Sequence, residues 1–215
     1  MTRIDSTSED FLRKQQEIYK SAYITIALLA INITIFILSN TILPVLFSRG
    51  ALYTEAILRA GESYRIFTAA FLHADLNHLF NNMIMLLLVG AIIENYIGHG
   101  LYLILYLLAG IIGNLLSVAY EINNQITRVS VGASGAIMGL VGFLVVWIVI
   151  NRKQLVQDRS MLIRLLFLLI FVIDACFFQE GANTEAHLGG FLTGFVIGVL
   201  NIVLFNNRKD MEGIA

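Results

Sequence analysis

Residues 132–150 read GASGAIMGLVGFLVVWIVI. The stretch carries no charged side chain, and a hydrocarbon core about 30 Å thick needs roughly 20 apolar residues in a helix to cross it. Because unpaired backbone groups are not tolerated in lipid, such a run is expected to be helical. We therefore expect a membrane-spanning helix from Gly132 to Ile150, with the hydroxyl of Ser134 in its first turn.

Five further stretches reach this length or come close to it. They are Ala22–Phe47, Asn77–Ile97, Leu101–Tyr120, Met161–Phe178 and Ala186–Phe205. The chain is 58% hydrophobic and only 13% charged, whereas an ordinary soluble domain carries about a quarter charged residues. The sequence therefore predicts an all-α polytopic membrane protein, a bundle of six transmembrane helices surrounded by a lipid bilayer. The span 161–178 is the least regular, because it contains Arg164 and Asp174.

Composition excludes several classes of site and partner. The net charge of −1 offers no electrostatic basis for binding nucleic acid. The single cysteine, Cys176, excludes an internal disulfide and a multi-cysteine metal site. The histidines have no carboxylate at a metal-ligand spacing such as His-Glu-x-x-His, so we expect neither a metal nor another cofactor.

Lysine and arginine indicate the orientation, because they are enriched in cytoplasmic loops. In a six-span arrangement, ten of the 14 lie on one side and four on the other. This predicts a short cytoplasmic N-terminal segment (1–20), a six-helix membrane domain (21–206) and a cytoplasmic C-terminal tail (207–215). The second, fourth and sixth helices then all begin at the outer face.

Two segments are too polar to span the membrane. Acidic residues among the first twenty, without an apolar run, argue against a signal peptide. Ser6 and Glu9 have the spacing of a capping box that opens a short amphipathic helix, although a partly disordered tail is the alternative. For the connection Ser48–Leu72, between the first two spans, we expect short interfacial helices with Tyr53 and Tyr64 at headgroup depth.

Polar residues gather where the second, fourth and sixth spans begin. These are His78 and Asn82, then Ser134, then His187. The predicted topology brings them to one depth, where polar groups are costly and function is the default hypothesis. Serine is a weak nucleophile until a neighbouring base takes its proton, and histidine has a suitable pKa for that task. The start of the fourth span also offers free N–H groups for a developing oxyanion.

Close packing of the fourth and sixth spans is needed for a hydrogen bond between Ser134 and His187. Gly135 and Gly139 form a small-xxx-small pair in the fourth span, and Gly190 and Gly194 form another in the sixth. Such pairs let helix backbones approach closely in membranes. The sequence therefore predicts a tight seam between these two helices, although such pairs alone say little about function.

From about Gly61 to Gly194, the chain resembles the rhomboid family of intramembrane serine proteases in its small six-helix bacterial form. The motifs that carry the resemblance follow one another as His78-x-x-x-Asn82, Gly132-x-Ser134-Gly135 and Ala186-His187-x-x-Gly190-x-x-x-Gly194. Further matches are Arg65, Phe71-Leu72-His73 and Glu94. Together these motifs are highly specific.

The resemblance implies a role for each matching residue. Ser134 would be the nucleophile and His187 its general base, a dyad without a carboxylate. His78, Asn82 and the backbone N–H of Ser134 would form the oxyanion hole. Arg65 would anchor the first loop, and Glu94 would have a structural role at the inner end of the second helix.

The resemblance also implies a bacterial plasma membrane location and substrates that are single-span membrane proteins, cleaved in or beside the transmembrane segment near the outer face. The loop Gln179–Glu185 is either a lid over the site or a plain connector. Two positions depart from the family pattern: Tyr64 stands where tryptophan is usual, and Met138 where tyrosine or phenylalanine often packs on the histidine ring. The second departure affects the expected rate more than the expected chemistry. A monomer would be competent, although the sequence does not determine the oligomeric state.

Two other functions are compatible with parts of the pattern. A catalytically inactive rhomboid-like scaffold or chaperone would bind client transmembrane helices, but inactive relatives lack the serine or the histidine. A small transporter would use His78, Asp174 and His187 as a proton path. The spans show no evident internal repeat, which disfavours the transporter.

Overall fold

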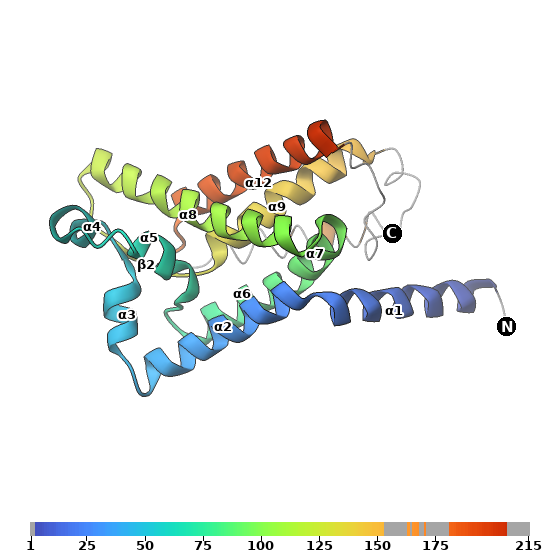
Figure 1. The fold of residues 1–215 in the computed structure, drawn as a ribbon, viewed down its shortest axis with the longest axis horizontal. Coiled ribbons are helices and arrows are strands. Elements are labelled where there is room, and N and C mark those ends of the chain that lie inside the picture. Colours follow the sequence, from blue (N-terminus) through green and yellow to red (C-terminus); the bar gives the residue numbers. More distant parts are fainter. Residues whose placement is uncertain (1–2, 153–162, 164, 168–169, 171–180, 206–215) are drawn as a thin grey trace.

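The computed structural model describes residues 3–152, 163, 165–167, 170 and 181–205. Helices dominate this part of the chain (Figure 1). The α-helices are α1 (Arg3–Ser21), α2 (Tyr23–Asn40), α3 (Val45–Gly50), α4 (Thr54–Ala60), α5 (Arg65–Thr68), α6 (Leu76–Met85), α7 (Ala91–Ile97), α8 (His99–Asn124), α9 (Ser134–Ile150) and α12 (Thr184–Phe205). The remaining elements are a 3-10 turn η1 (Ala69–Phe71), a π-helical turn η2 (Leu86–Gly90) and two short strands, β1 (Leu52–Tyr53) and β2 (Val129–Ser130).

Four stretches of helix in the described part are long and apolar enough to cross a membrane. They are Tyr23–Asn40, Leu76–Ile97, His99–Asn124 and Thr184–Phe205. The apolar helix α9 is shorter. The predicted all-α polytopic architecture is thus confirmed. Most of the predicted span Met161–Phe178 lies outside the described residues, so the count of six remains a prediction.

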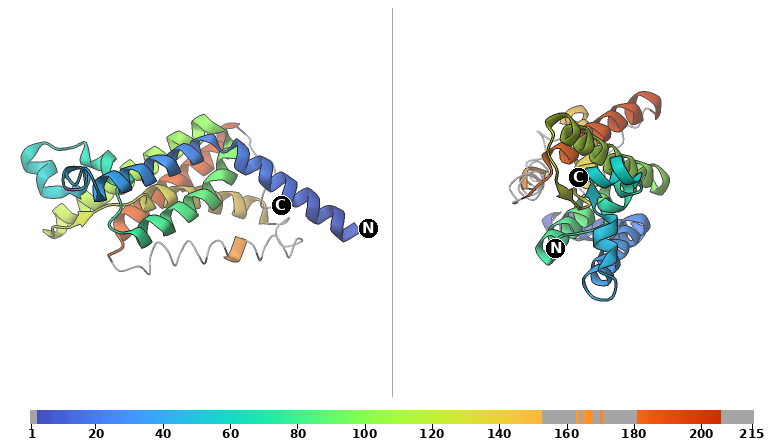
Figure 2. Two further views of the ribbon diagram at one scale, coloured as in Figure 1. Left: turned by 90° about the horizontal axis from the view of Figure 1, so that it is seen from below. Right: turned by 90° about the vertical axis from the view of Figure 1, so that its left-hand side faces the viewer.

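Helices α8, α9 and α12 pack against one another, while α2 lies beside the continuous stretch α6–η2–α7 (Figures 1 and 2). Helix α1 projects beyond the end of the bundle opposite to α4 (Figure 2). The core between the two groups is apolar, and its fully buried members include Leu86, Ile93, Tyr102, Leu105 and Leu140.

Glycines form the predicted seam between α9 and α12. A methyl group on Gly190 would overlap the carbonyl oxygen of Gly135, and one on Gly194 would overlap that of Gly139. Hydrogen in place of a side chain therefore lets the two backbones touch at both levels. This contact sets the separation of the helices that carry Ser134 and His187.

The predicted first span, Ala22–Phe47, was wrong at its C-terminal end. Helix α2 ends at Asn40, and a turn leads into α3, which runs at a steep angle to it (Figure 1). Pro44 has no N–H to donate, and its ring disfavours helical geometry at the preceding residue. The N–H of Leu43 instead bonds back to the carbonyl of Leu38 at 2.8 Å.

Two other boundaries differ from the prediction. Helix α1 begins at Arg3, so Ser6 lies inside the helix and not at its start. The connection between the predicted spans Asn77–Ile97 and Leu101–Tyr120 shortens to Gly98 alone, because α8 already begins at His99. Gly98 has a φ of +81°, a backbone conformation that glycine adopts without strain.

The connection between the first two spans folds into short helices, as predicted. Arg65 is buried there, and its guanidinium donates to the carbonyls of Ser48 (3.0 Å) and Ala51 (2.7 Å). It also pairs with Glu62 at 2.6 Å, and this bond holds the pKa of the Glu62 carboxyl below its usual value. The pairing of β1 with β2 was not predicted; it joins the connection after α3 to the segment before α9, with Leu52 opposite Ser130.

Candidate active site

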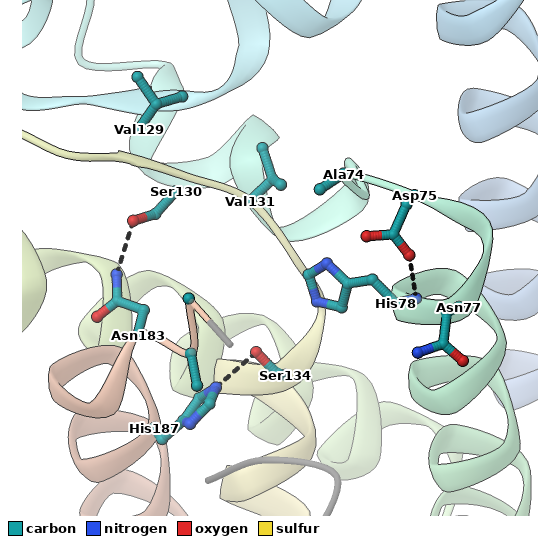
Figure 3. A pocket seen from close by; sticks show the side chains of 12 residues that line it. Ala74, Asp75, Asn77, His78, Val129, Ser130, Val131, Ser134, Asn183 and His187 are labelled. Carbon is teal, nitrogen blue, oxygen red and sulfur yellow. Dashed lines mark hydrogen bonds between the residues drawn. The ribbon is translucent and has the colours of Figure 1, made fainter. Parts of the chain in front are cut away.

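An open cavity of about 490 Å³ lies where α6, α9 and α12 begin (Figure 3). The sequence predicted that these three helix starts would lie together. The lining residues come from the start of α6, from β2 and the loop after it, and from the segment that enters α12: Ala74, Asp75, Asn77, His78, Val129, Ser130, Val131, Ser134, Gly181, Ala182, Asn183 and His187.

Ser134 and His187 meet at the edge of this cavity. The hydroxyl oxygen Oγ of Ser134 is 2.7 Å from Nε2 of His187, a distance at which the hydroxyl donates to a neutral imidazole. Ser134 is the first residue of α9, and His187 lies in the first turn of α12. The imidazole is almost fully buried, whereas Ser134 is partly exposed to the cavity. The arrangement therefore joins a shielded base to an accessible hydroxyl.

His78 approaches Ser134 from the α6 side (Figure 3). Gly132 lies between them with a φ of +132°, which side chains rarely adopt. The position that a Cβ of Gly132 would occupy is 2.8 Å from Nε2 of His78 and 3.6 Å from Oγ of Ser134. Glycine therefore keeps a small space open between an imidazole nitrogen and the serine hydroxyl.

Asn82 lies one turn further along α6 and is buried. Its Nδ2 donates to the carbonyl oxygen of His78 at 2.9 Å, and the residue is not part of the cavity lining. A primary amide has two N–H donors, so this bond uses one of them. The structure thus places His78 in the cavity and Asn82 behind it.

Two polar residues of this region were not singled out from the sequence. Asp75 caps α6, because its Oδ1 accepts from the N–H of His78 at 2.8 Å. An aspartate three residues before His78 has the spacing of an N-cap and was recognisable as such. Asn183, from the loop considered as a lid, lines the cavity and binds residues of two other elements. Since those contacts are distant in sequence, no local pattern indicated them.

His73 lies fully buried behind His78, with the two rings edge to face at a centroid distance of 5.1 Å. Within the described part of the chain, neither ring nitrogen of His73 has a hydrogen-bond partner. Burial lowers the pKa of His73 to about 3, with a further contribution from His78. His73 is therefore neutral at physiological pH.

Glu94 joins the first three spanning stretches at the far end from the cavity. Its carboxylate accepts from the backbone N–H groups of Ile24 and Thr25 (both 2.8 Å) and from the hydroxyl of Thr25 (2.7 Å). It also lies 2.6 Å from Nδ1 of His99. A negative charge at the start of α2 is favourable for the helix dipole, so Glu94 has the structural role expected of it.

No group of three or more potential ligands from His, Cys, Asp and Glu occurs among the residues that the structure describes. Asp174, the carboxylate of the transporter alternative, lies outside them. Met138 is buried in α9, one turn after Ser134, and belongs to the apolar core.

Comparison with known proteins identifies the family. Residues 60–203 match the family model described as the rhomboid domain. The chain belongs to the rhomboid family. The matched residues thus include the cavity lining with Ser134 and His187.

Individual relatives agree with this assignment. The putative rhomboid protease YdcA of Bacillus subtilis is 34% identical over 65% of this chain and 68% of its own length. Rhomboid-like protease 3 of Toxoplasma gondii is 33% identical over 81% of this chain and 66% of its own length. RHOMBOID-like protein 1 of Arabidopsis thaliana is 32% identical over 77% of this chain but only 43% of its own length. This rhomboid thus spans less than half of some plant relatives that it matches.

Proposed function

We propose that this rhomboid is an intramembrane serine endopeptidase with Ser134 as nucleophile and His187 as general base. The observation that carries the proposal is the 2.7 Å separation of Oγ of Ser134 and Nε2 of His187 beside an open cavity. A base within hydrogen-bond reach is what turns a serine hydroxyl into a nucleophile. Membership of a family with proteases among its relatives supports the same activity.

The chemistry follows two steps. Oγ of Ser134 attacks the scissile carbonyl carbon while His187 takes the hydroxyl proton, and His187 then gives that proton to the departing amine. Water next attacks the acyl-serine ester as His187 takes its proton, which returns to Oγ when the ester bond breaks. The first N–H groups of α9 lack partners within the helix, so the backbone N–H of Ser134 is suited to the oxyanion.

His78 would complete the oxyanion hole, and Asn82 would contribute its second N–H. The support is stronger for His78, because its Nε2 and the hydroxyl of Ser134 lie on either side of the space at Gly132. The support for Asn82 is weaker, since its Nδ2 donates to the carbonyl of His78 and the residue does not line the cavity.

The substrates would be single-span membrane proteins cut in or beside the transmembrane segment. A helical amide is already hydrogen-bonded, so a substrate helix must unwind locally before its scissile bond can enter. Residues 181–183 line the cavity and belong to the loop that would act as a lid. A bacterial plasma membrane with both termini in the cytoplasm remains the expected setting, with cleavage near the outer face.

The test is cleavage of a fluorogenic transmembrane peptide by the purified chain in liposomes. We expect Ser134→Ala and His187→Ala each to abolish cleavage, and Ser63→Ala, at an exposed serine, to retain it. Cleavage that survives Ser134→Ala would refute the assignment. A fluorophosphonate probe distinguishes an inactive scaffold, because a scaffold would not become labelled at Ser134.

A further inference from the structure

Asn183 stands at the entrance to α12, four residues before His187. Its Oδ1 accepts from the backbone N–H of Ala186 at 3.0 Å, which is the geometry of an N-cap. Its own carbonyl accepts from the N–H of His187 at 3.0 Å. Asn183 is therefore bonded to the turn of helix that carries the imidazole.

The same side chain binds two other elements. Its Nδ2 donates to Oγ of Ser117 in α8 at 2.7 Å and to Oγ of Ser130 in β2 at 3.0 Å (Figure 3 shows the second bond). Both amide hydrogens and the amide oxygen are thus in use. The contact with Ser117 is buried, and the contact with Ser130 lies at the cavity wall, so the Asn183 side chain is held from two directions.

Neighbouring contacts do not restrain α12 in the same way. The backbone of Ala186 lies against Gly113 of α8 and Gly135 of α9. Glycine contacts set how close helices come, but they have no directional bond that stops a helix from turning or sliding. Glu185 also pairs with Arg128 at 3.2 Å, but the two facing atoms, Nη2 and Oε2, lack the geometry of a hydrogen bond, so this ion pair is less directional than the bonds of Asn183.

We infer that Asn183 is a positioning residue that holds the imidazole of His187 against Ser134; the inference rests on the proposed protease function. Its three side-chain bonds orient the first turn of α12 relative to α8 and β2. A misplacement of about 1 Å at a reacting group costs roughly 100-fold in rate. Asn183 acts through His187, so losing it slows the chemical step without weakening substrate binding.

The experiment compares Asn183→Ala with wild type in liposomes, using a fluorogenic transmembrane peptide and a fluorophosphonate probe. We expect kcat and the rate of probe labelling at Ser134 to fall roughly 100-fold, with KM within twofold of wild type. The matched control is Asn124→Ala, which removes an exposed asparagine amide whose Nδ2 donates to the backbone carbonyl of Tyr120 within its own helix; it should leave both rates unchanged.

A second variant separates positioning from capping. Ser117→Ala combined with Ser130→Ala leaves the N-cap bond intact and removes both bonds of Nδ2, so we expect the same loss of kcat. This variant also carries the test if Asn183→Ala does not fold. A wild-type kcat in the double variant, or a raised KM with unchanged kcat in Asn183→Ala, would overturn the inference. If wild type neither cleaves nor labels, the proposed function has failed instead.

Discussion

Two joints of the bundle are built on opposite principles. Where α9 meets α12, glycines bring backbone against backbone at Gly135–Gly190 and Gly139–Gly194. Where α2 meets α7 and α8, a buried carboxylate, Glu94 of α7, makes hydrogen bonds with two other chain segments, α2 and α8. Where backbones touch, no side chain can move to change the spacing, so the first joint fixes the distance between α9 and α12. The second joint contributes buried hydrogen bonds, so it contributes mainly to the free energy of unfolding.

The difference matches what each joint supports. The glycine joint carries Ser134 and His187, whose chemistry depends on a separation of 2.7 Å. The carboxylate joint lies at the opposite end of Leu76–Ile97 from His78 and carries none of the proposed catalytic residues. Changes at the first joint should therefore reduce rate, and changes at the second should reduce the free energy of unfolding.

The largest effect is expected from Gly190→Ala. The added methyl would overlap the carbonyl oxygen of Gly135, forcing α9 and α12 apart and breaking the Ser134–His187 bond. Peptide cleavage should fall by about 100-fold or more. Gly100→Ala is the control, because among the described residues no atom beyond its chain neighbours and its own helix backbone lies within 4 Å of the added carbon. Equal rates for the two variants would show that the seam does not set the distance.

Glu94→Ala tests the other joint. It leaves the N–H groups of Ile24 and Thr25 without their acceptor, and a buried network that loses a charged member destabilises by about 3 kcal/mol. Thermal unfolding in detergent should show that loss, while kcat per folded molecule stays close to wild type. Glu55→Ala, which removes an exposed pair with Arg59, should cost less than about 1 kcal/mol. A large loss of kcat without loss of stability would reverse the comparison.

Within the site, His78→Ala should reduce kcat more than Asn82→Ala. Removing an oxyanion donor costs about 100-fold or more, and His78 lines the cavity whereas Asn82 does not. We expect a smaller loss for Asn82→Ala, since its amide already bonds the helix backbone. Steady-state kinetics with the transmembrane peptide measure both. A greater loss at Asn82 would mean that α6 rearranges when substrate binds.

The last prediction concerns pH and acts on stability alone. The pKa of His73 is about 3 in the folded protein and about 6.5 in an unfolded chain. Below pH 6.5 the unfolded state therefore binds a proton that the folded state does not, and stability falls as the pH drops toward 3. The slope is about 1.4 kcal/mol per pH unit from this residue. Thermal unfolding of wild type and His73→Gln at pH 7 and pH 5 should show a smaller pH-dependent loss in the variant; identical losses would contradict the assignment.

The sequence by itself determined the positions of the described spans and the residue types where they begin. Apolar runs are a property of composition and length, so α2, the stretch Leu76–Ile97, α8, α9 and α12 were all predicted near their observed positions. The motifs around Ser134 and His187 identified the candidate dyad, because polar residues that gather at one membrane depth on three helices are not readily explained by packing alone. Boundaries were less certain: the turn at Pro44 was missed because the apolar run continues through it.

Only the tertiary structure decided which atoms touch. The separation of Ser134 and His187, the difference between His78 and Asn82, and the three-way bonding of Asn183 each depend on contacts between residues far apart in the chain. Hydrophobic pattern constrains where a helix lies but not its rotation or its register against a neighbour. Those are set by glycine contacts and directional hydrogen bonds between segments, which exist only once the bundle has formed.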